Sequence, residues 1–235
     1  MTTISFAKGT RIGKRKNNED SHDIVMRDNA ALLIVADGLG GHSGGEIASR
    51  SLVNTVGQCF IEASIDQLKN HKAFFSYAIA EAHKMIHKAA VAAGKFEFEP
   101  KTTCVIAFIH GDTLNWCHVG DSRLYLVRDG MIAFHTSDHI AKGFKKNAPI
   151  NRCVGGSEAP KPTLNESLKL EQGDLVFLCT DGAWHQLKLD DLNKVKFENP
   201  QGSIDKLLKA IEGRNPHPSD NITAVAACFG AKKPG

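Results

Sequence analysis

The chain has 235 residues, of which 42% are hydrophobic, and its 29 Lys and Arg residues exceed its 26 Asp and Glu residues to give a net charge of +3. This length and composition match one ordinary globular domain and exclude both a disordered chain and a disulfide-stapled mini-protein. So small a charge excess argues against nucleic acid as a partner, because nucleic-acid binders concentrate phosphate-neutralising charge.

The sequence also argues against a membrane or secreted protein. No apolar run approaches the ~18 residues that a membrane span needs, and the longest, 30–36, has the length of a strand. Residues 1–6 lack the charged and apolar regions of a secretory signal. The six cysteines form no C-x-x-C pair, which is typical of reduced thiols. We therefore expect a cytoplasmic protein without a membrane partner.

Short apolar segments rich in β-branched residues predict strands, and two glycine turns at 110–112 and 128–130 predict hairpins. The expected strands are 31–36, 103–109, 114–119, 124–127, 175–179 and 222–229.

Helical segments have apolar residues at three- and four-residue spacing. This spacing predicts a long helix over 70–93 that ends at Gly94, and a shorter one over about 203–212. Another helix is expected to begin near Ser43, because Ser43 and Glu46 have the spacing of a capping box. Helices followed by hairpin-linked strands favour antiparallel sheets covered by helices.

Acidic residues next to glycine or asparagine stand at several strand ends and turns. Asp37 and Asp181 each follow a strongly apolar run, where a carboxylate is costly unless a cation meets it. Mg²⁺ and Mn²⁺ prefer such carboxylate oxygens, so the pattern predicts a divalent-metal site. Asp129-Gly130, between polar hairpin ends, indicates only a turn. The full set of acidic positions is Glu19-Asp20, Asp37-Gly38, Asp121, Asp181-Gly182 and Asp220-Asn221.

These positions belong to seven motifs that occur in one order along the chain. The motifs are Arg15-Lys-Asn-Asn-Glu19-Asp20-Ser, Val35-Ala-Asp37-Gly38-Leu-Gly40-Gly41-His42, Thr102-Thr103, Gly120-Asp121-Ser122-Arg123, Ser137-Asp138-His139, Cys179-Thr-Asp181-Gly182 and Asp220-Asn221-Ile-Thr223. In this order the chain resembles the metal-dependent serine/threonine phosphatases of the protein phosphatase 2C family. The resemblance implies an α+β fold, a four-layer α-β-β-α sandwich of two antiparallel sheets flanked by helices. Residues 1–230 would form a single phosphatase catalytic domain, followed by a short C-terminal tail at 231–235.

The resemblance also implies a metal centre with two Mn²⁺ or Mg²⁺ ions. Asp37 would bridge the two ions, and Asp181 and Asp220 would complete the protein ligands of the first. Asp121, together with Asp181, is similar to the ligand pair of a third, weaker metal in bacterial relatives.

Further roles follow from the same resemblance. Glu19 and the Gly38 carbonyl would bind the second ion, and Asp20 would hold its waters. Arg15, four residues before Glu19, would bind the substrate phosphate, a task that suits a guanidinium fork. The implied reaction is hydrolysis of protein phosphoserine and phosphothreonine by direct attack of a metal-bridging water, which needs no protein nucleophile. A Ser/Thr kinase that makes the substrate is then an implied partner.

Two departures from the family pattern concern substrate and acid catalysis. Leu39 stands where some members have a histidine, and His42 is not assigned that role, so the general acid is left open. The flap at 140–151 is short and basic. Its lysines, Lys142, Lys145 and Lys146, could meet an acidic phosphoprotein or form a solvated loop.

Other functions fit the sequence less well. A dinucleotide-binding loop would need glycine at Ser43, and Asp37 places negative charge where pyrophosphate should lie. His83 and His87 are spaced for zinc but lack an obvious third ligand. A non-catalytic phosphoprotein-binding or regulatory module on the same fold is the alternative from another class, and loss of metal ligands would be its mark.

Overall fold

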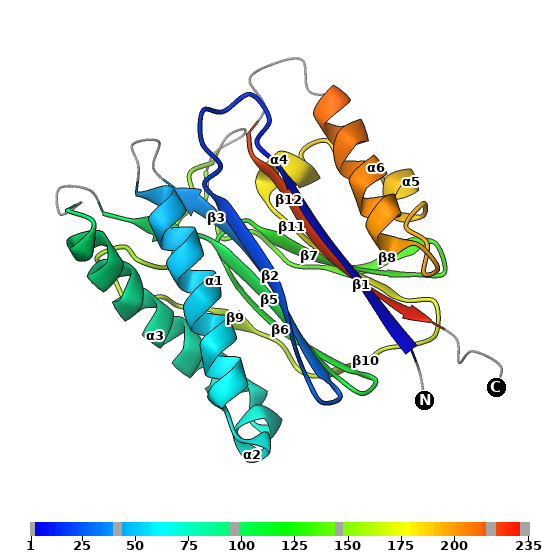
Figure 1. The fold of residues 1–235 in the computed structure, drawn as a ribbon, viewed down its shortest axis with the longest axis horizontal. Coiled ribbons are helices and arrows are strands. Elements are labelled where there is room, and N and C mark those ends of the chain that lie inside the picture. The colour runs from blue at the N-terminus through cyan, green and yellow to red at the C-terminus, as the bar shows by residue number, and fades with distance from the viewer. Residues whose placement is uncertain (1–2, 40–43, 95–98, 144–147, 215–219, 231–235) are drawn as a thin grey trace.

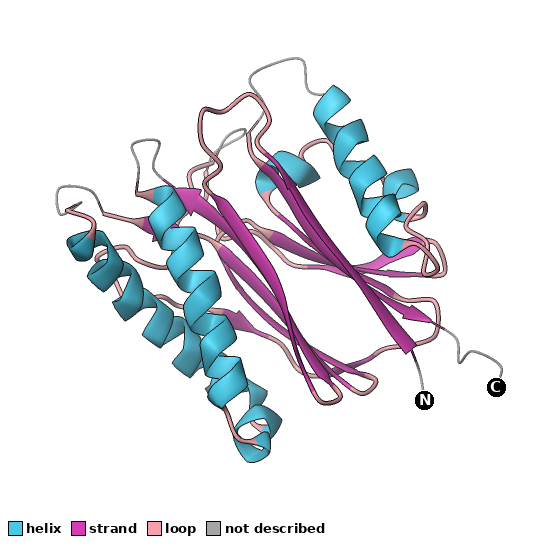
Figure 2. Cartoon of the chain, viewed as in Figure 1, coloured by secondary structure: helices cyan, strands magenta, loops and turns pink. Residues whose placement is uncertain are grey.

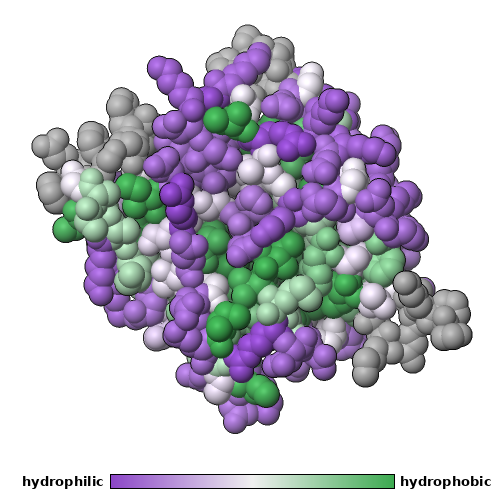
Figure 3. All heavy atoms as spheres, in the orientation of Figure 1, coloured by the Kyte–Doolittle hydropathy of each residue, from purple (hydrophilic) through white to green (hydrophobic). Residues whose placement is uncertain are grey.

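Two antiparallel sheets lie face to face, and helices cover the outer face of each (Figures 1 and 2). The computed structural model describes residues 3–39, 44–94, 99–143, 148–214 and 220–230. The layers therefore follow the order helix, sheet, sheet, helix, as the resemblance implies. In the space-filling view of the same face, hydrophobic side chains gather near the middle and hydrophilic ones surround them (Figure 3). The predicted tail at 231–235 lies outside the described residues.

The first sheet joins the two ends of the described chain. Its strand order is β1-β12-β11-β7-β8, with all neighbours antiparallel. β1 pairs with β12 along its whole length, from Thr3 opposite Gly230 to Arg11 opposite Ile222. The strands are β1 (Thr3–Arg11), β7 (Arg123–Arg128), β8 (Met131–His135), β11 (Leu175–Cys179) and β12 (Ile222–Gly230).

The second sheet has seven strands in the main order β10-β6-β5-β3-β2, with β4 added beside β3 and β9 beside β6. Its long central strand β3 carries the first predicted metal ligand, Asp37, close to its end. The strands are β2 (Asp20–Arg27), β3 (Ala30–Leu39), β4 (Lys101–Thr102), β5 (Cys104–His110), β6 (Thr113–Val119), β9 (Thr163–Leu164) and β10 (Leu168–Lys169).

Helices on the second sheet are α1 (Gly45–Glu62), α2 (Ile65–Lys69) and α3 (His71–Ala92). The first sheet is covered by α6 (Pro200–Arg214), next to the short helices α4 (Asp181–Trp184) and α5 (Leu189–Leu192). Among the described residues, none of these helices is long and apolar enough to span a membrane.

Residues of β3 are buried on both faces, which explains the continuous apolar run in the sequence. Leu33 and Val35 lie in the core between the sheets, whereas Leu32 and Ile34 lie in the core under α1 and α3. A strand covered on both faces needs apolar residues at every position. The same run ends at Asp37, so burial of the strand brings this carboxylate to the end of the sandwich.

All six predicted strands are confirmed with each end within three residues of its prediction, and both ends of the long helix lie within one residue of theirs. Asn70 caps α3, and Gly94 follows it with a φ of +69°. The preceding helix begins near its predicted start, but its predicted capping box is wrong. That helix, α1, begins at Gly45 with Gly44 as its N-cap and no side-chain cap, and Ser43 lies outside the described residues.

Candidate active site

Most of the predicted site residues line one cavity of about 550 Å³ at an end of the sandwich. Figure 1 shows how the chain builds it: the loop after β1, the end of β3 and the start of β12 lie at the same end. The predicted residues that line the cavity are Arg15, Glu19, Asp37, Gly38, Asp181 and Asp220. Asp20 and Asp121 do not line it, but their charges act on those of the lining carboxylates.

The position of Asp37 is fixed by its backbone. Asp37 N–H donates to Thr103 Oγ1 at 3.1 Å, and the Asp37 carbonyl accepts from Thr102 Oγ1 at 2.8 Å and from Thr103 N–H at 2.9 Å. Asp37 also stands opposite Asp20 in the β2–β3 register. The two threonines therefore hold the end of β3, and strand pairing brings a second carboxylate to it.

Burial and like charge disfavour ionisation of these two carboxylates. The pKa of Asp20 rises to about 7, chiefly because the group is desolvated, and Asp181 and Asp220 add repulsion. A hydrogen bond of 2.9 Å from Thr180 Oγ1 partly opposes that rise. For Asp37, burial first and then repulsion from Asp20 raise the pKa well above its usual value. A bound cation would favour the ionised forms of both.

Asp121 and Asp181 each have an unsatisfied buried oxygen. Among the described residues, no hydrogen bond reaches Asp121 Oδ1 or Asp181 Oδ1. Burial raises the pKa of Asp121 to about 7, and it raises the pKa of Asp181 with help from repulsion by Asp220. Buried oxygens normally have a partner. An all-carboxylate set with orphaned oxygens fits a hard divalent cation such as Mg²⁺ or Mn²⁺.

The carboxylates surround the cavity without closing on one point. Within the described part of the chain, no three His, Cys, Asp or Glu side chains form a ready-made metal-binding group. The charges are nevertheless coupled, since Asp37 is repelled by Asp20, Asp181, Asp220 and Asp121. A cation between these carboxylates would relieve the repulsion.

Two glycines allow the backbone segments at the cavity to approach closely. A Cβ at Gly38 would come within 2.3 Å of the Gly45 carbonyl oxygen and 2.6 Å of the Glu19 carbonyl oxygen. A Cβ at Gly45 would come within 2.7 Å of Glu19 Oε2. Gly38 N–H also donates to the Glu19 carbonyl at 3.1 Å. A side chain at either position would therefore push Glu19 away from the end of β3.

Arg15 and Asp220 are in direct contact, although they are far apart in sequence. Arg15 Nη2 donates to Asp220 Oδ2 at 2.7 Å, and the arginine side chain is 51% exposed. The guanidinium thus lies at the open side of the cavity, next to a predicted metal ligand. This position suits a group that meets an incoming phosphate.

Asn221 anchors the loop that carries Arg15 and Glu19, a role that sequence reasoning missed. Its Nδ2 donates to the carbonyls of Ile12 at 2.9 Å and Asn17 at 3.1 Å, and its Oδ1 accepts from Glu19 N–H at 2.8 Å. The Asp220-Asn221 motif was the sequence feature that pointed to this residue. The bonds themselves join residues more than 200 positions apart, so no local pattern indicates them.

A second missed group supports Asp121. Arg123 forms a two-point ion pair with Asp138 at 2.8 Å for each bond. The Arg123 guanidinium also lies 3.5 Å over the Trp184 ring. Trp184 Nε1 in turn donates to the Asp121 carbonyl at 2.9 Å. The two sequence motifs around Arg123 and Asp138 are therefore one structural unit that holds the backbone of Asp121.

The structure also locates the residues left open by the sequence. Leu39 lines the cavity, whereas His42 lies outside the described residues. His83 Nδ1 accepts from Gly155 N–H at 3.1 Å, and its ring lies 4.9 Å from that of His87. No third ligand completes a zinc site with this pair among the described side chains.

The two described ends of the predicted flap pair in antiparallel fashion. Ile140 pairs with Ile150, and Ala141 N–H donates to the Pro149 carbonyl at 2.9 Å. Ile150 lines the cavity, and Lys142 is exposed. Lys145 and Lys146 lie outside the described residues. The flap therefore borders the site.

Comparison with known proteins agrees with this architecture. A family model described as Protein phosphatase 2C matches residues 9–214. Protein phosphatase PhpP of Streptococcus pneumoniae is 25% identical over 233 residues, which cover 86% of this chain and 94% of PhpP. The structure of the S. agalactiae serine/threonine phosphatase matches with a TM-score of 0.83 and 26% identity, over 97% of this chain and 100% of that one.

A further match is the catalytic domain of the serine/threonine protein phosphatase PstP in complex with two manganese ions. Its TM-score is 0.78 at 28% identity, and the match covers 98% of this chain and 100% of that one. The family match spans most of the chain, and the fold and the curated relatives agree with it. This chain therefore belongs to the protein phosphatase 2C family of serine/threonine phosphatases.

Proposed function

We propose that residues 1–230 act as one catalytic domain that hydrolyses phosphoserine and phosphothreonine on proteins with the help of two Mn²⁺ or Mg²⁺ ions. The observation that carries this proposal is the cavity itself. Carboxylates from β3, α4 and the start of β12 line it together with one exposed guanidinium. The manganese in the related PstP structure supports the choice of metal.

The carboxylates of this chain divide into two proposed ligand sets. Asp37 would serve both ions, with Asp181 and Asp220 on the first. Glu19 and the Gly38 carbonyl would bind the second ion.

Two further carboxylates have proposed roles. Asp20, behind Asp37, would accept hydrogen bonds from the waters of the second ion. The orphaned oxygens of Asp121 and Asp181 support a third, weaker site between those two residues. When bound, the ions supply an activated water and positive charge for the phosphoryl oxygens.

Arg15 would orient the phosphoryl group. Its guanidinium offers paired donors that match phosphate oxygens. In the structure this guanidinium pairs with Asp220 at the open side of the cavity. Substrate phosphate would therefore meet Arg15 and the metal ligands at the same place, which favours an oriented attack over simple capture of an anion.

The cellular setting is also a proposal. A phosphoprotein substrate implies a Ser/Thr kinase that makes it. All six cysteines are free thiols, four of them buried, which supports a reducing compartment such as the cytoplasm.

The test is phosphate release from a phosphothreonine peptide, measured with Mn²⁺ and with excess EDTA. We expect turnover with Mn²⁺ and none with EDTA or in the Asp37→Asn variant. Asp190→Asn is the matched control, since Asp190 is an exposed carboxylate on α5 that does not line the cavity. Full activity of Asp37→Asn would refute the assignment of the metal centre.

A further inference from the structure

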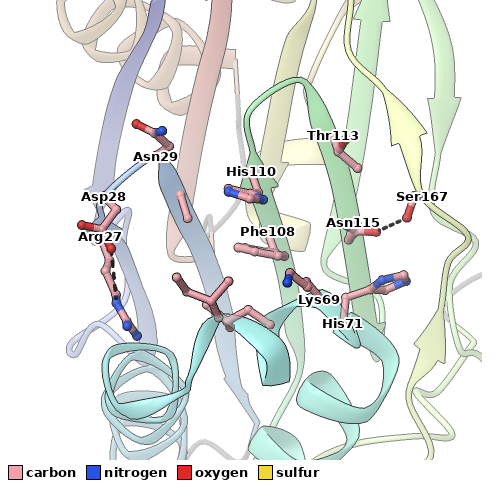
Figure 4. Close-up of a pocket in the computed structure, with 13 residues that line it drawn as sticks. Arg27, Asp28, Asn29, Lys69, His71, Phe108, His110, Thr113, Asn115 and Ser167 are labelled. Atoms are coloured by element: carbon pink, nitrogen blue, oxygen red, sulfur yellow. Dashed lines mark hydrogen bonds and ion pairs between the residues drawn. The ribbon is translucent and has the colours of Figure 1, made fainter.

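A second cavity, of about 380 Å³, lies at the opposite end of β3 from the active site. We call it the α2 pocket; it is bounded by Phe108, His110 and Asn115 on the sheet and by Ile65, Leu68 and Lys69 on α2 (Figure 4). Ala30 of β3 also lines it, whereas Asp37 lines the active-site cavity. Seven residues of strand at ~3.3 Å each separate the two by about 23 Å. The α2 pocket is therefore a separate site.

One wall of the α2 pocket carries two stacked aromatic rings. Phe108 and His110 are two residues apart on β5, so they share a face of the sheet. Their rings are nearly parallel, with an interplanar angle of 7° and centroids 6.3 Å apart. Figure 4 shows both projecting from β5 on the side where α2 lies. Ile65 and Leu68 of α2 provide aliphatic surface on the facing side. Two apolar walls of this kind accept a flat ring.

A buried amide supplies a hydrogen-bond donor to this space. Asn115 is only 5% exposed and stands opposite Phe108 in the β5–β6 register. Its Oδ1 accepts from Ser167 Oγ at 2.7 Å (Figure 4). In the described part of the chain its Nδ2 makes no hydrogen bond. This nitrogen keeps access to the space of the pocket, so it can donate to an acceptor that enters there.

The charges around the α2 pocket favour an anion. Lys69 comes from α2, and its ammonium pairs with the largely exposed Asp66 at 2.9 Å. In Figure 4, Arg27 and Asp28 stand at one end of the pocket and His71 at the other. Arg27 interacts with Asp28 at 3.7 Å. Among the described residues that line the pocket, Asp28 is the one carboxylate; it is 81% exposed and already paired. A ligand acid would therefore compete with the exposed Asp66 for Lys69 and would meet the unpaired amide of Asn115.

We propose that the α2 pocket binds a small flat aromatic or heteroaromatic carboxylate that is not a substrate. Its ring lies between the Phe108–His110 wall and Ile65. Its carboxylate accepts from Asn115 Nδ2 and pairs with Lys69. The cavity volume falls in the range of small-molecule sites, which combine apolar walls with a few oriented polar groups.

Calorimetric titration of the Mg²⁺-loaded protein with indole-3-acetate tests the proposal, with indole and acetate as separate probes. We expect saturable binding at one site, with a Kd at least tenfold lower than that of either fragment. Ile65→Trp, at a position that is 59% exposed, should block the pocket and raise the Kd at least tenfold. Ile61→Trp is its matched control, because Ile61 is 46% exposed on α1 and does not line the pocket.

The charged contact has its own pair of variants. Lys69→Ala should raise the Kd about two- to fivefold, as expected for a partly exposed ion pair. Lys84→Ala, which breaks a similar exposed pair with Glu81 on α3, should leave it unchanged. His110→Glu places a negative charge on the exposed part of the wall and should weaken binding without filling the pocket.

Three results would overturn the proposal. The first is that indole-3-acetate does not saturate the protein at concentrations of about 5 mM, where even a Kd of 1 mM would be visible. The second is that the Ile65→Trp and Ile61→Trp variants bind it equally well. The third is that indole binds as tightly as indole-3-acetate. If Ile65→Trp fails to fold, judged by its circular dichroism, His110→Glu decides the question in its place. Phosphatase activity enters none of these readouts, so the test is independent of the proposed reaction.

Discussion

Replacing Asn221 with alanine should both destabilise the fold and impair the active site. The side chain is 4% exposed and makes three hydrogen bonds, to Ile12, Asn17 and Glu19. At about 1 kcal/mol net for each bond, the loss is about 3 kcal/mol of unfolding free energy. For a chain of this size each kcal/mol shifts the melting temperature by about 2–4 °C, so Tm should fall by about 6–12 °C.

The same substitution should lower kcat/KM by at least about tenfold, because the loop after β1 carries Arg15 and Glu19. Small displacements of positioning groups are sufficient for such losses. Urea denaturation gives the stability change, and phosphate release from a phosphothreonine peptide at a temperature where the variant is folded gives the activity.

Asn193→Ala is the control, since its exposed amide makes one bond, to the Gly130 carbonyl at 3.0 Å. This variant should change the free energy of unfolding by less than about 1 kcal/mol and leave kcat/KM unchanged. If Asn221→Ala also lowers the free energy of unfolding by less than about 1 kcal/mol and keeps the wild-type kcat/KM, the anchoring role is wrong.

Further predictions concern the metal centre and a distant ion pair. Asp37→Asn and Asp181→Asn should each abolish turnover in a folded protein, checked by phosphate release and circular dichroism, whereas Arg15→Ala should chiefly raise KM. Removal of divalent metal with EDTA should lower Tm, and added Mn²⁺ should restore it, because ions that bind only the folded state stabilise it. Hydrogen bonds from Arg214 are the main cause of the lowered Asp191 pKa. The stability that they give is fully present above the unfolded pKa of 3.8 and is lost progressively as pH falls through the lower pKa of the folded state. Arg214→Gln should therefore lower the free energy of unfolding by about 2 kcal/mol at pH 7 and by less at pH 3, as measured by urea denaturation.

The elements that could be predicted from sequence are those whose environment is uniform along the segment. β3 is apolar at every position because both of its faces are buried, and α3 repeats its apolar residues at helical spacing. β1 and β2 gave no such signal, because most of their residues are only half-buried. The five-residue helix α2 is too short for a period to be visible.

Some features of the candidate site could be predicted from local sequence, whereas others depend on contacts between distant segments. The position of Asp37 at the end of an apolar strand is local information, and so is that of Asp181. That Arg15 meets Asp220 depends on the pairing of β1 with β12, which no local pattern records. The resemblance to the phosphatase family was what implied that Arg15 and Asp220 belong to one site. The hydrogen bonds of Asn221 that hold this arrangement can be identified only from the structure.

The pairing of β1 with β12 sets the moment at which a newly made chain can become active. Arg15 and Asp220 are 205 positions apart, and the residues between them must be synthesised before the two can meet. The second sheet and its helices, by contrast, are built mainly from residues before 170. We therefore expect a ribosome-bound chain that ends before residue 220 to fold part of its sandwich while it holds no competent site. Catalysis would begin only when the last strand emerges and pairs with the first.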